Sequence, residues 1–521
     1  MNEYEVLYLI KQNIEEKISK NKLFKLSIEE ATLIVLEKVG VFFRLNHSAQ
    51  FDKKQEYFKK IVRTNKTEIN EVSFFQESIK WIFRWCTQYC SKESLIDNKE
   101  VVANDIYDLM GIAYSYDEFF TMWDLHRAKK VKYNKIGNKI TFDYRNEDVY
   151  KTHVFYDTFF REINNEKQIK ELNSLQINQE NIIQIMNLVH QIDFDCSFNI
   201  EFEGFNLEDY KVFSTVLTQM FTQIMLNNIH RNIYILNQEK EGVLYLKKEE
   251  WIDKLSEESG LMQEKVENII DFFTYDFSSD SSDISLSYFV PHCDNYISVS
   301  EAIFNLSRPA ANAMRLLAKK KSSNYDYAQN NFETEEILKI KNNIPEKYLM
   351  TGELDKAKKN RPGMDLLIYD KEFNHLQIIE LKYKIPIEST WDIKRLDEML
   401  DKAYGQVDKA KMYTNTNLSM ILNEYFGESY KRIIPDKIDY FILTNYSIGT
   451  GANTSLPTPI LLIDHYVELM KYGNGMELVE NTLNKNNKML PVESKKRYSR
   501  FSLLGNKILV PEYSFKLPAT L

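Results

Sequence analysis

GMDLLIYDKEFNHLQIIELKYK, residues 363–384, is the most informative segment of this chain. It contains two apolar runs, GMDLLIYD (363–370) and HLQIIELKYK (375–384), joined by a short polar segment. Runs of this length that are rich in Leu and Ile and bounded by polar turn residues are typical of buried β-strands. Because the polar connection is as short as a hairpin loop, we predict a pair of antiparallel strands.

Three charged residues hold defined positions in these two strands. Asp365 opens the first apolar run, Glu380 ends the second, and Lys382 follows two residues later. Strand residues two apart point to the same face, so Glu380 and Lys382 project together. Pairing the strands as a hairpin brings Asp365 beside Glu380. Asp and Lys are disfavoured in strands, and unpaired buried charges are costly, so this cluster indicates a functional site.

The order of elements around this hairpin predicts a small mixed sheet flanked by helices, over residues 306–447. Two helices come first, separated by a polar stretch at 322–331, and a strand leads into the hairpin. A further helix and a last strand follow. The expected helices are 308–321, 332–344 and 393–413, and the strands outside the hairpin are 347–355 and 437–445.

Two carboxylates and a lysine at one point of a sheet suit the hydrolysis of phosphodiester bonds. That reaction needs an activated water and stabilisation of negative charge on the phosphate. Asp365 and Glu380 can hold Mg²⁺ or Mn²⁺ while leaving positions open for water and a phosphate oxygen. Lys382 can orient the water or stabilise the developing charge. The alternative interpretation is a salt-bridged hairpin face without chemistry.

The same residues resemble the PD-(D/E)xK motif of the restriction-endonuclease-like nucleases. The matching positions are Pro362, Asp365, Glu380 and Lys382, with fourteen residues between the Asp and the Glu-x-Lys. The family's Pro directly precedes its Asp, whereas Pro362 stands three residues before Asp365. The predicted order of helix, three-stranded meander, helix and strand also resembles the family's core. Gln406 matches a Gln that the helix after the motif often carries.

The resemblance covers only residues 306–447 and implies a metal-dependent nuclease. It implies that Asp365 and Glu380 bind the metal and that Lys382 is catalytic. Family members commonly add an acidic residue from the helix before the meander. Glu333 and Glu336 share one face of that predicted helix. We favour Glu336 as this residue, with Glu333 as the substitute.

Residues 1–240 are expected to form a mainly helical region that senses a trigger or a partner. Segments such as IEEATLIVLEKVGVFF (28–43) have apolar residues at three- and four-residue spacing, as amphipathic helices do. A long helix is predicted at 101–130, with Gly111 as the point where it could break. The alternating segment 130–144 predicts a β-hairpin that turns at Gly137.

Residues 241–305 have the order of a winged-helix unit. A helix that ends at Gly260 is followed by a second helix and by two alternating segments. The second helix, 261–273, carries three acidic residues against one lysine, and phosphates repel such a helix. We therefore favour a structural or dimerising unit over one that reads DNA. Residues 448–521 are expected to pack on the 306–447 unit.

Composition limits the class of protein. The 521-residue chain has a formal net charge of −9, which argues against binding nucleic acid through the overall field but leaves room for a local basic groove. The four cysteines lack zinc-site spacing, so free thiols in a reducing compartment are expected. The sequence shows neither a signal-peptide pattern nor an apolar run long enough for a membrane span, and we expect a cytoplasmic protein.

These observations predict an α+β multidomain protein that is a metal-dependent endonuclease. DNA is the expected substrate, with RNA as the second candidate, and bacterial defence against phage or foreign DNA is the expected role. A protein or ligand trigger would act on the N-terminal region, and a homodimer or higher oligomer would allow both strands to be cut. The alternative is a non-catalytic nucleic-acid-binding or assembly module with the same fold.

Overall fold

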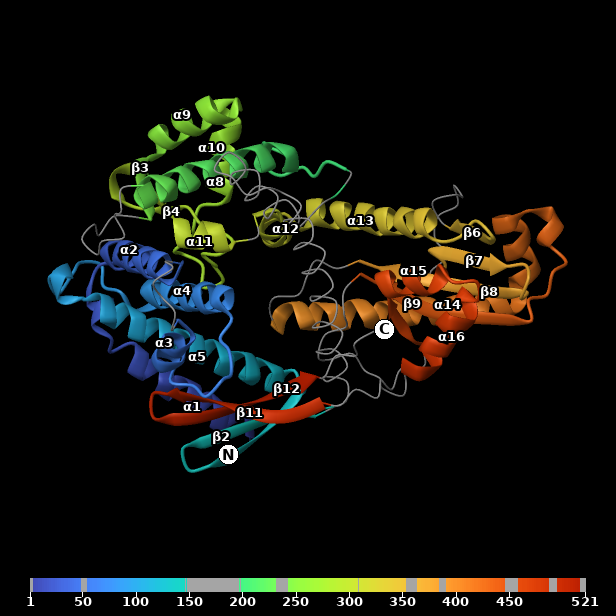
Figure 1. The fold of residues 1–521 in the computed structure, drawn as a ribbon, viewed down its shortest axis with the longest axis horizontal. Helices are drawn as coiled ribbons and strands as arrows, with labels where there is room; N and C mark the ends of the chain where they lie inside the picture. The colour runs from blue at the N-terminus through green and yellow to red at the C-terminus, as the bar shows by residue number, and fades with distance from the viewer. Residues whose placement is uncertain are drawn as a thin grey trace.

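The computed structural model of this protein describes residues 3–47, 54–145, 147, 196, 198–230, 242–307, 309–352, 363–383, 390–445, 458–486 and 494–515. In these ranges the protein is α+β, as predicted, and it combines its helices with three β-sheets of four, five and three strands (Figure 1). None of the helices in these ranges combines the length and the apolar character that a membrane-spanning helix requires.

The N-terminal region is a helical body with an aromatic core. Its helices are α1 (Glu3–Ile18), α2 (Ile28–His47), α3 (Lys54–Val62), α4 (Glu71–Tyr89), α5 (Ala103–Arg127) and α8 (Leu207–His230), with the short 3-10 helices η1 (Lys22–Lys25) and η2 (Asn98–Glu100). Apolar residues at helical spacing turn one face of each helix inward. In α4, this inward face includes the fully buried rings of Phe74, Phe75 and Phe83. Asn70 caps α4 by accepting a hydrogen bond from the Ser73 backbone N–H.

Helix α5 runs without a break through Gly111, so the sequence pattern was misleading at this point. A Cβ atom on Gly111 would lie 2.3 Å from the carbonyl oxygen of Ile61 in α3. Glycine is therefore required here because α3 and α5 approach each other closely, and it does not interrupt the helix.

A four-stranded sheet joins both halves of the chain. Its strands are β1 (Val131–Ile136), β2 (Lys139–Tyr144), β11 (Ser494–Leu503) and β12 (Asn506–Phe515), in the order β1-β2-β12-β11. Strands β1 and β2 form the predicted hairpin around Gly137, and β12 runs parallel to β2. The expectation that all of 448–521 packs on the 306–447 unit is therefore wrong for β11 and β12. Their buried Phe501, Leu503 and Ile508 belong to the N-terminal core.

The order of elements predicted for residues 241–305 is present. The elements are β3 (Val243–Lys247), α9 (Lys248–Ser259), α10 (Gln263–Phe272), β4 (Val290–Pro291), η3 (Cys293–Asn295), β5 (Tyr296–Ser300) and α11 (Glu301–Leu306). The three strands form an antiparallel sheet in the order β3-β5-β4. Two acidic residues of α10, Glu267 and Asp271, pair with Lys248 of α9 at 3.0 and 2.8 Å. The acidic face of α10 thus contacts α9, which agrees with a structural role.

The third unit has the predicted order of helix, three strands, helix and strand. Its elements are α12 (Pro309–Lys320), α13 (Ser322–Asn343), β6 (Tyr348–Gly352), β7 (Leu366–Asp370), β8 (His375–Lys382), α14 (Thr390–Phe426), η5 (Glu428–Tyr430), β9 (Lys437–Thr444), β10 (Ile460–Leu462), α15 (Ile463–Met470) and α16 (Gly475–Asn486). The five strands form a mixed sheet in the order β10-β9-β8-β7-β6. Strands β6, β7 and β8 are antiparallel, and β9 is parallel to β8.

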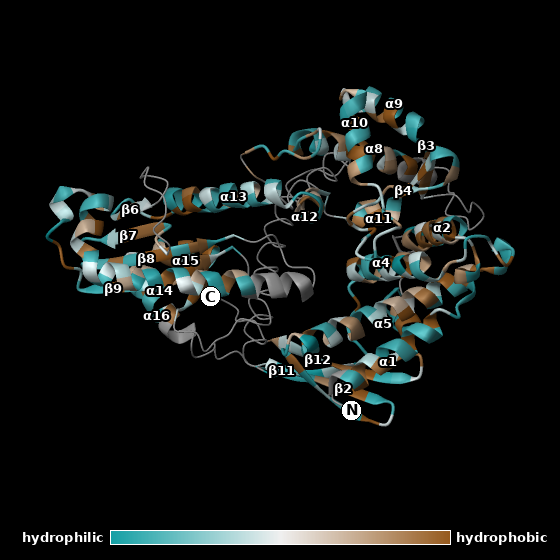
Figure 2. Ribbon diagram, turned by 180° about the vertical axis from the view of Figure 1, so that it is seen from behind, coloured by the Kyte–Doolittle hydropathy of each residue, from teal (hydrophilic) through white to brown (hydrophobic). Residues whose placement is uncertain are grey.

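Helices cover both faces of this sheet, and its central strands are hydrophobic (Figure 2). On one face, Leu366, Ile379 and Leu381 pack with residues of α13, α15 and α16. On the other face, Leu367 and Ile378 pack with residues of α14. A strand that is buried on both faces reads as a continuous apolar run, which explains the pattern seen in the sequence.

Helix α13 begins ten residues earlier than the sequence predicts, because residues 322–331 are helical and not a polar connection. Tyr325, Ala328 and Phe332 follow each other at three- and four-residue spacing and are all buried. This narrow apolar stripe stabilises a helix although most of the other residues in the segment are polar. Figure 1 shows α13 running from the N-terminal helices to the five-stranded sheet.

Candidate active site

The hairpin of β7 and β8 has the register that brings the predicted residues together. Leu366 pairs with Ile379, and the next pair beyond it is Asp365 with Glu380. The Asp365 carboxylate accepts a hydrogen bond of 2.7 Å from the Leu381 backbone N–H. Side chains alternate along each strand, so Asp365, Glu380 and Lys382 lie on the face that α14 covers.

Lys382 and Glu380 form a close ion pair. The Lys382 Nζ atom lies 2.5 Å from Glu380 Oε1, and the Lys382 side chain is only 13% exposed. Glu380 is completely buried. Burial raises the pKa of Glu380 above its ordinary value, and the nearby Lys382 and Asp365 offset this only in part. Burial also acts to lower the pKa of Lys382, but the charges of Glu380, Glu333 and Asp365 outweigh it and raise that pKa.

Of the two upstream glutamates, the structure brings Glu333 to this cluster. Glu333 Oε1 lies 4.0 Å from Lys382 Nζ and accepts a 3.4 Å hydrogen bond from the Tyr383 backbone N–H. Glu336 lies about one helical turn further along α13, 3.7 Å from the Nζ atom of Lys339. The geometry therefore favours Glu333 over Glu336, the residue preferred from the sequence. Glu333 and Glu336 share a face of α13, and they differ only in that the end of β8 lies beside Glu333.

Two glycines fix the backbone at Asp365. A Cβ atom on Gly352 of β6 would lie 2.2 Å from the Asp365 carbonyl oxygen. Gly363 has φ +84°, and a Cβ atom there would lie 2.5 Å from the carbonyl oxygen of Gln406 in α14. Gln406 thus lies beside the segment that leads into β7. These close approaches hold the Asp365 backbone between β6 and α14.

Asp365 and Glu380 are the two residues of this cluster that could hold a divalent cation such as Mg²⁺. Both oxygens of the Glu380 carboxylate are buried and lack a hydrogen bond of normal geometry, and Asp365 lies beside them on the same face. Burying a charged carboxylate without hydrogen bonds costs free energy unless a cation lies beside it. Here the ammonium group of Lys382 is that cation. Among the described residues, no group of three or more His, Cys, Asp or Glu side chains is arranged to hold a metal. Mg²⁺ is commonly held by one or two carboxylates, with water and phosphate oxygens as further ligands.

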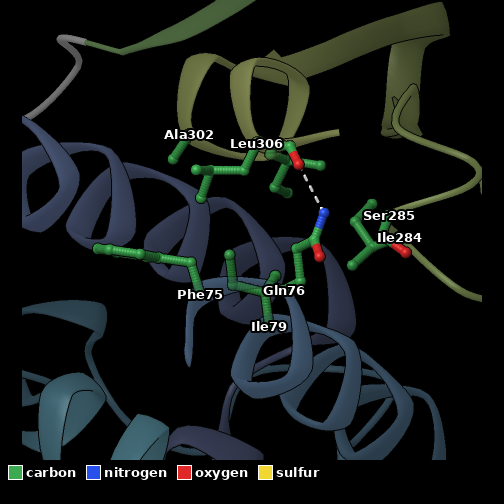
Figure 3. Close-up of a pocket in the computed structure, with 8 residues that line it drawn as sticks. Phe75, Gln76, Ile79, Ile284, Ser285, Ala302 and Leu306 are labelled. Atoms are coloured by element: carbon green, nitrogen blue, oxygen red, sulfur yellow. Dashed lines mark hydrogen bonds between the residues drawn. The ribbon is translucent and has the colours of Figure 1, made fainter. Parts of the chain in front are cut away.

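Pro362, the first residue of the motif, lies outside the described residues. A small pocket is found elsewhere, between α4, the Ile284–Ser285 segment and α11 (Figure 3). Its wall is almost entirely apolar, and the side chain of Gln76 donates a 2.6 Å hydrogen bond to the Leu306 carbonyl oxygen. This pocket is a packing gap in the N-terminal core and has no part in the charged cluster.

Replacement of Gly363 by Ala tests whether the backbone at Asp365 is constrained. The variant must adopt a positive φ and place a Cβ atom against Gln406, so we expect a loss of about 1–3 kcal/mol in the free energy of unfolding, measured in urea. The matched control is Gly405→Ala on the exposed face of α14, where no atom lies within 4 Å of the new Cβ. The control should gain up to about 1 kcal/mol, because Ala favours a helix over Gly. Equal stability of the two variants would contradict the constraint.

The raised pKa of Glu380 predicts a pH dependence of stability in the metal-free protein. A raised folded-state pKa stabilises the protein fully below the ordinary value of 4.5, and this contribution is lost as pH rises through the folded-state pKa. In EDTA, the wild type should therefore lose free energy of unfolding relative to Glu380→Gln as pH rises above about 4.5. Lys382→Met should steepen the loss, because Glu380 then charges without its cation. A difference that is flat with pH would show that Glu380 is not perturbed.

No protein-family model, no curated protein and no solved structure matches the chain.

Proposed function

We propose that this chain is a metal-dependent nuclease that hydrolyses phosphodiester bonds, with DNA as the favoured substrate and RNA as the second candidate. One observation carries the proposal. The hairpin register brings Asp365 beside Glu380, and Lys382 lies 2.5 Å from Glu380 at the same end of two buried strands. A sheet that needed only stability would fill these positions with apolar residues, because a buried ion pair seldom stabilises more than a hydrophobic replacement.

Asp365 and Glu380 would hold Mg²⁺ or Mn²⁺. The bound ion supplies an activated water and neutralises charge on the phosphate. Glu380 is buried, so its carboxylate is shielded from bulk water and acts strongly on a neighbouring cation. Asp365 keeps one carboxylate oxygen on the Leu381 N–H, and this contact orients the side chain.

Lys382 would act as a fixed positive charge and not as a base. Its pKa is raised above the ordinary lysine value by the surrounding carboxylates, so the ammonium keeps its proton at neutral pH. A protonated amine can donate to the attacking water or to a phosphate oxygen, but it cannot accept a proton. Glu333, 4.0 Å away, adds negative charge that helps to keep Lys382 protonated.

The alternative is a non-catalytic module that binds nucleic acid or assembles with other proteins. The closeness of Lys382 to Glu380 favours it, since the pair could be purely structural. In both cases the N-terminal body would be the place where a protein or ligand trigger acts. Defence against phage or foreign DNA, and a homodimer that cuts both strands, belong to the nuclease proposal as roles that the resemblance permits.

Cleavage of plasmid DNA and of a structured RNA in Mg²⁺ or Mn²⁺ tests the nuclease. We expect Asp365→Asn and Lys382→Ala to lower the cutting rate by roughly 100-fold or more, because each removes a charge that stabilises the transition state. The matched control is Lys437→Ala, which breaks the ion pair with Glu480 near the opposite end of the sheet and should cut normally. Cutting that survives both site substitutions would refute this assignment. A wild type that binds DNA without cutting it would favour the non-catalytic module.

Metal binding can be measured apart from cutting. Mg²⁺ at about 100 times its dissociation constant should stabilise the wild type by about 2.7 kcal/mol, seen as a rise in melting temperature over EDTA. Asp365→Asn should lose most of this rise. Asp439→Asn removes a carboxylate that pairs with His375 on the same sheet and should keep the rise. If Mg²⁺ stabilises all three proteins equally, the metal binds elsewhere.

A further inference from the structure

The backbone just beyond the candidate active site is held by one helix and not by the sheet. The last pair between β8 and β9 is Lys382 with Thr444. The next residue, Tyr383, receives a 3.4 Å hydrogen bond at its carbonyl oxygen from Gln329 Nε2, and its N–H donates to Glu333 at 3.4 Å. Its ring stacks on Phe332 with centroids 4.7 Å apart and planes at 19°.

These three contacts come from a single face of α13. Gln329, Phe332 and Glu333 stand at positions i, i+3 and i+4, which are neighbours on a helix surface. Two of them bind the Tyr383 backbone, one at its carbonyl oxygen and one at its N–H, and the third contacts its ring. We refer to this set of three contacts as the α13 clasp.

The clasp lies where α13 passes from one hydrophobic core to another. Upstream, Phe332 is buried in the N-terminal core and touches Phe198 with ring centroids 4.9 Å apart. Downstream, Ile337 and Ile340 are buried in the core of the five-stranded sheet, together with Leu381 of β8. One rigid helix thus belongs to both bodies, and the residues that grip Tyr383 lie at the crossing.

The position of Lys382 depends on this backbone. A lysine side chain is long and flexible, so the location of its ammonium follows from where its Cα is held and from its partners. The Lys382 Nζ atom contacts Glu380 at 2.5 Å, the Leu381 carbonyl oxygen at 3.0 Å and Glu333 at 4.0 Å. Glu333 therefore touches both the clasped backbone and the ammonium that the backbone carries.

We propose that Tyr383 is a positioning residue for Lys382, and that the α13 clasp makes the N-terminal core part of the active site's support. The proposal rests on the proposed nuclease function for its kinetic consequence. A displacement of about 1 Å in a reacting group can lower a rate by roughly 100-fold. A change in the N-terminal body that shifts α13 would therefore alter catalysis without touching the substrate, and this is how a trigger would reach the site.

Kinetics in the full-length chain test the positioning role. Tyr383→Leu and Phe332→Leu should lower kcat by roughly 10- to 100-fold with KM changed less than about threefold, because Lys382 is misplaced while substrate contacts remain. Tyr383→Phe keeps the ring that stacks on Phe332 and should have the wild-type kcat. Phe213→Leu is the matched control, since Phe213 is a fully buried ring of the same core whose ring contacts are with Tyr210 and Phe289.

Acetylation of Lys382 by acetic anhydride, followed by mass spectrometry, gives a second readout that needs no enzyme activity. The rate should rise severalfold in Phe332→Leu and in the milder Gln329→Ala, and should stay at the wild-type value in Tyr383→Phe and Phe213→Leu. Unchanged labelling in Phe332→Leu and Gln329→Ala would overturn the clasp. Faster labelling with normal kcat would overturn the positioning role. If the wild type proves inert as a nuclease, the labelling result still decides whether the N-terminal core holds Lys382.

Discussion

The single register between β7 and β8 is the constraint on which the candidate site depends. Side chains alternate between the two faces of a sheet, so a shift of one residue would move Asp365 to the face opposite Glu380. Such a shift is costly, because it would turn the Asp365 carboxylate towards the apolar core that Leu366 shares with α13, α15 and α16. Gly352 and Gly363 then hold the start of β7 against β6 and α14. The hydrophobic cores thus determine where the charges meet.

Much of this unit could be predicted from local pattern alone. The apolar runs of β7 and β8 are long enough to identify both strands, and the two-residue spacing of Glu380 and Lys382 places them on one face. Residues 322–331 were harder to interpret, because a stripe of only Tyr325, Ala328 and Phe332 is obscured by polar neighbours. The sequence could not distinguish Glu333 from Glu336, since both lie on one face of the helix. Only tertiary packing determines where along α13 the end of β8 lies.

Contacts between distant parts of the chain could not be predicted either. Strand β12 pairs in parallel with β2, more than 350 residues earlier, and nothing in either segment specifies the other. The contacts between α13 and Tyr383 could not be predicted for the same reason. The three α13 residues have helical spacing, which any amphipathic helix shares, and Tyr383 reads as one more strand residue. Local sequence reports which face is buried, whereas the partner that covers it follows from the whole fold.

The return of β11 and β12 to the N-terminal sheet has a consequence for how the chain can be divided. The unit that contains the five-stranded sheet and the candidate site is an insertion between two segments of one body, so it cannot be separated from that body by a single cut. A chain shortened after α16 would leave β2 as an unprotected edge, with Ile140 and Thr141 losing the strand beside them. Exposed edges of this kind recruit strands from other molecules, so such a fragment would tend to aggregate.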